Sequence, residues 1–97
     1  MTAERFEGDW DHIIVGGGSA GCVLANRLSA DPRRRVLLLE AGGEARHPYL
    51  HVPAGFLTTF RDPRFNWNFA TEPGSGVNGR TIHTPRGRVL GGSSAIN

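Results

Sequence analysis

Hydrophobic residues fall into short uniform runs near the start of the chain and lose any regular period later. Residues 12–15 (His-Ile-Ile-Val) and 36–39 (Val-Leu-Leu-Leu) are apolar runs that glycines soon follow, the pattern of a buried strand. The first run predicts a strand over about 11–16. Between the runs, apolar residues recur at near-helical spacing over 19–31, and Pro32 ends that pattern.

Two uniformly apolar strands joined by one helix predict a βαβ unit with a parallel sheet. The fold class expected from this pattern is therefore α/β, with a Rossmann-like βαβ unit at the start of the chain.

The pattern is irregular after Gly43. Residues 44–66 contain three prolines and no sustained period, which predicts a long functional loop with one helical turn near 55–60. Alternating residues over 67–72, then turn signals, then 80–84 predict a short β-hairpin.

The last residues carry a helix-start signal. A Ser pair at 93–94 is typical of a helix N-terminus, yet the chain stops at Asn97 with no helix behind it. We therefore expect the sequence to be incomplete at this end.

Length and composition allow one small globular domain. The chain has 97 residues, of which 38% are hydrophobic and 21% charged, and its 14 glycines and 6 prolines indicate many loops. No apolar run approaches the ~18 residues of a membrane span, and residues 1–12 lack a signal-peptide pattern. These features predict a cytoplasmic protein without a transmembrane segment.

Charge and cysteine content narrow the function further. The net charge is only +2, and the arginine run 33–35 lies between two predicted elements, where a solvated turn is expected. We expect no nucleic-acid partner, because the chain lacks a basic face with base-reading groups. The single cysteine, Cys22, excludes an internal disulfide and a metal site made of cysteines alone, and no metal site is predicted.

Residues 16–21 (Gly-Gly-Gly-Ser-Ala-Gly) form a G-x-G-x-x-G motif between the first strand and the helix. Gly16 permits a tight turn, Gly18 leaves room for a pyrophosphate, and Gly21 allows close helix–strand packing. Ser19 and Ala20 open the helix, whose free N–H groups favour a diphosphate. The motif predicts dinucleotide binding, and a glycine-rich turn in another kind of α/β domain is the alternative.

Glu40 ends the second strand, about twenty residues beyond the glycines. A carboxylate at this place accepts hydrogen bonds from ribose hydroxyls and repels a 2′-phosphate. Glu40 therefore favours FAD or NAD over NADP.

Residues 86–97 form a second glycine-rich block, with three glycines, two serines and an Asn. Flexible backbone, N–H donors, hydroxyls and an amide suit a second contact with a polar cofactor. A helix cap without any ligand is equally compatible with the spacing.

Residues 11–22, 37–43, 66–73 and 85–97 resemble the glucose–methanol–choline (GMC) oxidoreductases, and most closely their choline dehydrogenase-like branch. The resemblance covers nearly the whole chain, and the block Gly-Arg-Val-Leu-Gly-Gly-Ser-Ser is its most specific part. It implies FAD as cofactor and oxidation of a small-molecule alcohol by hydride transfer to the flavin.

The resemblance also implies a set of cofactor contacts. These are Gly16, Gly18, Ser19, Ala20, Gly21, Glu40, Ala41, Gly42, Val89, Gly91, Gly92, Ser93, Ser94 and Asn97. Family members with a histidyl-linked flavin carry the histidine in the last block. Ile96 stands at that position here, so the resemblance implies FAD bound without a covalent link.

Length is where the chain departs from the family. Residues 1–97 are expected to be the N-terminal part of a single FAD-binding domain, with the substrate domain and the catalytic histidine downstream. No catalytic residue is assigned among the four histidines, which we interpret as structural or exposed. The leading hypothesis is the FAD-binding portion of a flavin-dependent alcohol oxidoreductase. The alternative is a stand-alone nucleotide-binding module, or a truncated remnant, without catalysis.

Three further expectations concern packing. Cys22 is expected to be a buried inert thiol. Trp67 and Phe69 are expected in the core. Phe56, Phe60 and Phe65 are expected to pack the long loop.

Overall fold

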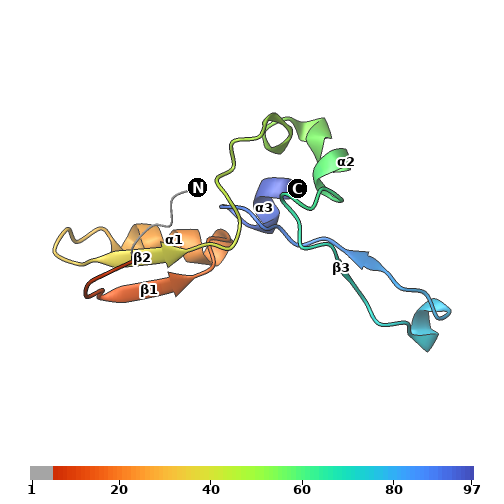
Figure 1. Ribbon diagram of the computed structural model, residues 1–97, viewed down its shortest axis with the longest axis horizontal. Coiled ribbons are helices and arrows are strands. Elements are labelled where there is room, and N and C mark those ends of the chain that lie inside the picture. The colour runs from red at the N-terminus through yellow and green to blue at the C-terminus, as the bar shows by residue number, and fades with distance from the viewer. Residues whose placement is uncertain (1–5) are drawn as a thin grey trace.

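The computed structural model describes residues 6–97. Strand β1 (His12–Val15) leads into helix α1 (Ser19–Leu28), which leads into strand β2 (Val36–Leu39). The two strands pair in parallel, in a register that sets His12 opposite Val36. Figure 1 shows α1 lying along this pair of strands. Residues 1–5, part of the N-terminal stretch analysed for a signal peptide, lie outside the described residues.

Helix α1 is shorter than the sequence pattern predicts. It ends at Leu28, and the N–H of Ser29 closes its last turn by donating to the carbonyl of Ala25. The Asp31 carboxylate then accepts from the backbone and side chain of Arg33 and forms a separate turn. These local hydrogen bonds compete with continued helix, as they commonly do for Asp.

The loop that follows contains short helical pieces. Two 3-10 turns, η1 (Pro48–Leu50) and η2 (Pro53–Gly55), each begin at a proline, which suits the first helical position. Helix α2 (Phe56–Thr59) follows directly and confirms the predicted helical turn.

The predicted hairpin is present and is shorter than expected. Strand β3 (Phe69–Ala70) pairs antiparallel with β4 (His83–Thr84), and the turn η3 (Ser75–Val77) lies between them. Helix α3 (Ser93–Ile96) forms at the predicted helix start.

The overall shape is elongated. The β1–α1–β2 unit and the hairpin lie at opposite ends, with α2 and α3 between them (Figure 1). The radius of gyration is 16.6 Å, against about 13 Å for a compact domain of 100 residues. The chain therefore has little interior of its own.

The core is small and lies in the middle of the molecule. Phe65, Val89 and Ile96 are buried against one another, with Leu50 among the half-buried residues around them. The oxygen of Ile96 accepts the hydroxyl of Thr59, which ties α2 to α3.

The prediction that both strands are buried is wrong for the described residues. In β1 only Ile14 is buried, while Val15 is 83% exposed, and β2 is half-buried throughout. Within residues 6–97 no third strand pairs with β1 or β2, so each of them is an edge strand of a two-stranded sheet.

Three other packing expectations need correction or refinement. Trp67 and Phe69 are not core residues, because their side chains are 45% and 52% exposed. Phe65 is buried as expected, and Phe56 is 40% exposed beside Phe60. The Cys22 thiol is half-buried and donates to the Gly17 carbonyl at 3.3 Å.

None of the helices in residues 6–97 is long and apolar enough to cross a membrane.

Candidate cofactor-binding site

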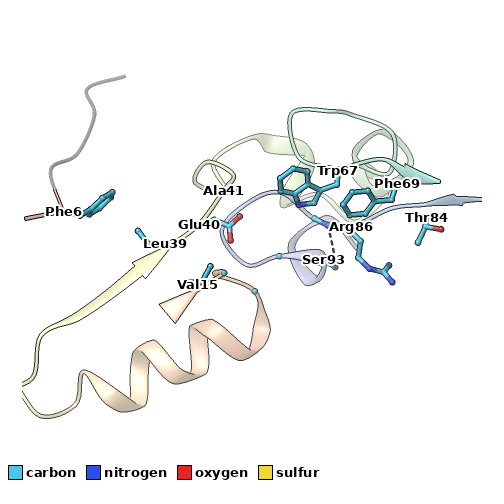
Figure 2. Close-up of a pocket in the computed structure, with 14 residues that line it drawn as sticks. Phe6, Val15, Leu39, Glu40, Ala41, Trp67, Phe69, Thr84, Arg86 and Ser93 are labelled. Atoms are coloured by element: carbon cyan, nitrogen blue, oxygen red, sulfur yellow. Dashed lines mark hydrogen bonds between the residues drawn. The ribbon is translucent and has the colours of Figure 1, made fainter. Parts of the chain in front are cut away.

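An open groove runs from the carboxyl ends of β1 and β2 to the hairpin, with a volume of about 900 Å³ (Figure 2). Ligands of open α/β sheets bind at this edge of the strands. The residues that line the groove are Phe6, Val15, Gly16, Gly18, Leu39, Glu40, Ala41, Trp67, Phe69, Thr84, Arg86, Gly87, Gly92 and Ser93.

The first glycine loop forms one side of the groove. Gly16 has φ +100°, a conformation that residues with a side chain rarely adopt. A side chain on Gly21 would collide with the Gly16 carbonyl, so Gly21 allows α1 to pack closely on β1. A Cβ on Gly18 would point into open space, with its nearest neighbour, the Gly92 Cα, 4.0 Å away. A Cβ on Gly16 would likewise meet nothing within 4 Å, so Gly16 and Gly18 both leave room for a ligand at the groove.

Helix α1 presents its first turn beside the groove. Its N-cap residue is Gly18, and no side chain caps the helix. The first N–H groups of a helix have no partner within the helix and carry a partial positive charge. This end of α1 is therefore suited to an anion such as a diphosphate.

The Glu40 carboxylate joins the two loops that follow the strands. Its Oε2 accepts the Gly17 N–H at 2.7 Å, and its Oε1 accepts the Gly42 N–H at 2.9 Å. Each carboxylate oxygen has a second lone pair, so Glu40 can still accept from a ligand hydroxyl. Sequence reasoning identified Glu40 only as a ligand contact and missed this bridge between loops.

The second glycine-rich block runs between these two loops. The Gly91 N–H donates to the Gly17 carbonyl at 2.7 Å, and the Leu90 N–H donates to the Gly43 carbonyl at 2.8 Å. A side chain on Gly42 would collide with the Arg88 backbone. The two glycine motifs of the sequence therefore form one continuous structure.

Contacts between the two motifs extend to their serines. Gly92 has φ +66°, and a Cβ there would lie 2.8 Å from the Gly18 Cα. The hydroxyls of Ser19 and Ser94 are hydrogen-bonded at 2.8 Å. The Ser93 hydroxyl accepts the Gly87 N–H at 3.0 Å and lines the groove. The start of α1 and the start of α3 are thus held side by side.

The structure brings some of the predicted contacts to the groove and places others elsewhere. Those that line it are Gly16, Gly18, Glu40, Ala41, Gly92 and Ser93. Val89 is 1% exposed in the core and does not line the groove, so the structure does not bring this predicted contact to the groove. Asn97 lines a smaller hollow of about 320 Å³ beside Phe60 and Ser94. The remaining predicted residues, Ser19, Ala20, Gly21, Gly42, Gly91 and Ser94, flank or support the glycine loops.

Sequence reasoning missed the hairpin side of the groove. Trp67, Phe69, Thr84 and Arg86 line it, and none of them was predicted as a site residue. Alternation of large apolar and polar residues over 67–72 was the available signal, because it places Trp67 and Phe69 on one face.

The four histidines all lie outside the groove lining. His51 contacts the Ala45 carbonyl at 2.6 Å, His83 contacts the Asn68 side chain at 3.0 Å, and His47 accepts the Tyr49 N–H. Residues 6–97 also contain no group of three or more His, Cys, Asp or Glu side chains that could hold a metal ion.

Comparison with known proteins decides the family. Residues 10–97 match the GMC oxidoreductase family. The chain belongs to this family. Similar curated proteins include the alcohol dehydrogenase [acceptor] of Pseudomonas putida, 54% identical over 91% of this chain, and the human mitochondrial choline dehydrogenase, 48% identical over 92%.

Solved structures of GMC relatives agree with the fold described above. Pyridoxine 4-oxidase from Mesorbium loti superposes with a TM-score of 0.83 and 47% identity over 92% of this chain. A formate oxidase superposes with a TM-score of 0.81 and 33% identity over 91%. This chain spans only 16% of the length of the two curated relatives and 17% and 16% of the two solved chains.

The matched region is the N-terminal domain of the GMC oxidoreductases, which is their FAD-binding domain. The groove fits such a cofactor, because Gly18 leaves open space beside an uncapped helix end and a carboxylate that can accept further hydrogen bonds. The sequence-based prediction of FAD as the family's cofactor is confirmed.

Proposed function

We propose that this chain is the N-terminal part of the FAD-binding domain of an alcohol-oxidising GMC enzyme. In this proposal β1–α1–β2 is the Rossmann-type dinucleotide-binding unit, and the substrate domain lies outside the 97 residues. The observation that carries the proposal is the meeting of Gly18, Glu40 and Ser93 on one groove, because they come from both glycine motifs and from the strand end between them.

The first glycine loop would hold the FAD pyrophosphate. The open space at Gly18 allows the phosphates to approach the backbone, and the uncapped first turn of α1 supplies N–H donors and a favourable dipole. The contacts of Gly91 and Gly92 with this loop keep it in place.

Glu40 would orient the adenosine part of FAD. Its two hydrogen bonds to Gly17 and Gly42 fix the carboxylate at the groove wall, where the free lone pairs accept ribose hydroxyls. The fixed negative charge also repels a 2′-phosphate, which favours FAD over NADP-type nucleotides.

FAD would be held without a covalent bond. No histidine, cysteine or tyrosine is among the residues that line the groove. Ile96, at the position where some relatives carry the linking histidine, is 3% exposed and packs in the core.

The bound flavin would supply the hydride acceptor for oxidation of the alcohol. This chain's residues would bind and orient that cofactor. The general base that removes the hydroxyl proton would come from residues outside the chain, because none of its histidines lines the groove. Since an alcohol dehydrogenase and a choline dehydrogenase are among the relatives, an alcohol such as choline is the class of substrate to test first.

Nucleotide titration of the purified full-length apoprotein tests the proposal. FAD should bind with a 1:1 stoichiometry, NADP should not compete with it, and the loaded enzyme should reduce a dye with an alcohol. An apoprotein that binds no FAD, or binds NADP in preference, would refute the assignment of the groove.

A further inference from the structure

The Asn66 side chain is buried in the middle of the molecule, where the residue is 2% exposed. Its amide nitrogen donates to the carbonyls of Thr59 at 3.2 Å and Phe60 at 2.8 Å. Its amide oxygen accepts the N–H of Asn68 at 2.8 Å and that of Arg86 at 3.1 Å. Both N–H donors and both lone pairs of the amide are therefore used, and one side chain joins three segments of the backbone.

The carbonyls that Asn66 holds lie at the end of α2. The last carbonyls of a helix have no partner within the helix, and Thr59 and Phe60 are the last residue and the C-cap of α2. Thr59 is fully buried, and its hydroxyl donates to the Ile96 carbonyl at 3.0 Å. Burial keeps water away from these groups, so the Asn66 amide is the donor that satisfies them.

The oxygen of Asn66 acts at the base of the hairpin. Residues 65–67 and 86–88 run antiparallel there, with Asn66 opposite Gly87. The Trp67 N–H donates to the Arg86 carbonyl at 2.9 Å, and the Arg88 N–H donates to the Phe65 carbonyl at 2.7 Å. Because Asn66 also accepts the Arg86 N–H, its side chain fixes the backbone that leads into Gly87.

Gly87 carries this placement to the groove. Its N–H donates to the Ser93 hydroxyl at 3.0 Å, and a Cβ on Gly87 would collide with the Gly92 carbonyl. Gly87, Gly92 and Ser93 all line the groove, where Ser93 lies close to Arg86 (Figure 2). Asn66 is not among the lining residues. A shift of the backbone at Asn66 would therefore reach the groove wall through Gly87.

We infer that Asn66 is a positioning residue for FAD binding, which sets Ser93 at the groove through Gly87 and does not touch the cofactor. This inference rests on the proposed function. An apolar side chain of similar size could fill the same space, but it could not hold the end of α2 and the Arg86 N–H in one arrangement. A buried amide with every hydrogen bond made is a rigid connection between the segments that it joins.

Two substitutions of Asn66 separate positioning from packing. Asn66→Asp keeps the shape and the acceptor oxygen, but its negative charge faces the carbonyls of Thr59 and Phe60, so the side chain and the N–H groups bound to it should shift. Asn66→Ser is smaller and uncharged, and it provides a second variant that does not bury a charge. Asn26→Asp is the matched control, because Asn26 is exposed on α1 and does not line the groove.

The full-length apoprotein is titrated with FAD well below the melting temperature of each variant. Asn66→Asp should raise the dissociation constant for FAD about tenfold, the scale of one buried hydrogen bond left unmade. Asn66→Ser should change it in the same direction, and Asn26→Asp should leave it unchanged. The double variant with Ser93→Ala should lose less affinity than the product of the two single losses, because Asn66 acts through Ser93.

Two outcomes would overturn the inference. A lower melting temperature with unchanged FAD affinity in both Asn66 variants would show that Asn66 serves the stability of the fold alone. Losses that multiply fully in the double variant would show that Asn66 does not act through Ser93. An unsubstituted protein that binds FAD keeps the proposed function in both cases, whereas one that binds no FAD contradicts the proposed function itself.

Discussion

The Glu40 carboxylate accepts the N–H of Gly17 at 2.7 Å, across 23 positions of sequence. This hydrogen bond links the end of β2 to the glycine loop after β1. Since the other carboxylate oxygen holds Gly42, one side chain orders the two loops that form the proposed cofactor site.

Replacement of Glu40 should weaken FAD binding and loosen the glycine loop together. Glu40→Gln keeps one acceptor oxygen, but its NH₂ group would face an N–H donor of Gly17 or Gly42. Loss of a charged hydrogen-bond partner costs about 1.5–3 kcal/mol, or roughly ten- to a hundredfold in FAD affinity. Isothermal titration calorimetry with FAD gives the affinity. The hydrogen-exchange rate of the Gly17 amide measures how often the glycine loop opens.

Glu44→Gln is the control for this experiment, because Glu44 is exposed, pairs with Arg46 and does not line the groove. Normal FAD affinity in Glu40→Gln would remove Glu40 from the site, while faster exchange at Gly17 alone would leave it a purely structural role.

Gly92→Ala, a change in the second glycine-rich block, should displace the backbone of the first glycine motif. The new Cβ would lie 2.8 Å from the Gly18 Cα, at a residue with φ +66°. Strained backbone of this kind costs about 1–3 kcal/mol, so the melting temperature should fall and FAD binding should weaken. Gly43→Ala is the control, because a Cβ there meets nothing within 4 Å. Equal behaviour of the two variants would contradict the close packing of the motifs.

The ion pair between Asp62 and Arg64 should contribute to the free energy of unfolding, and this contribution should be lost in acid. The Arg64 side chain donates to Asp62 and lowers the pKa of that carboxyl below its ordinary value of 3.8. A lowered folded pKa means that the contribution is complete above the unfolded pKa and is lost as pH falls through the folded one. NMR titration of Asp62 should show a midpoint below 3.8 that rises in Arg64→Gln. The same midpoint in both proteins would rule out the ion pair as the cause.

Acid precipitation should release the flavin. The groove lining contains no histidine, cysteine or tyrosine, and Ile96 is buried in the core. Trichloroacetic acid should therefore leave a colourless pellet and yellow FAD in the supernatant of the full-length enzyme. Flavin that stays with the washed pellet would demonstrate a covalent link through a residue outside the groove lining.

The sequence predicts the local elements well because their signals are local. Apolar runs soon followed by glycines predict β1 and β2. Pro32 predicts only that α1 ends before it, and the earlier end at Leu28 goes with the local turn at Asp31. The turn signals around Asn78 define the hairpin, and Asn78 itself adopts a left-handed conformation. Each of these features depends on residues close together in the chain.

Burial and long-range contacts could not be predicted in the same way. Val15 looks like a core residue from its neighbours in sequence, yet its exposure depends on what lies beside β1 in space. The contacts of Gly17 with Gly91, and of Ser19 with Ser94, join distant segments that have no shared period. The glycine motifs alone indicate a nucleotide, and only the structure shows that one motif supports the other.

Substitution of Gly18 tests most directly whether the groove is an FAD site. A Cβ at Gly18 would enter the groove and would meet no atom closer than the Gly92 Cα, at 4.0 Å. Gly18→Val in the full-length protein should keep the melting temperature of the apoprotein and lose bound FAD, whereas Gly76→Val, also in open space and away from the groove, should keep both. The decisive measurement is the ratio of bound flavin to protein after purification. The ratio should be near zero for Gly18→Val and full for Gly76→Val, and a yellow Gly18→Val protein with normal flavin content would show that the groove is not the FAD site.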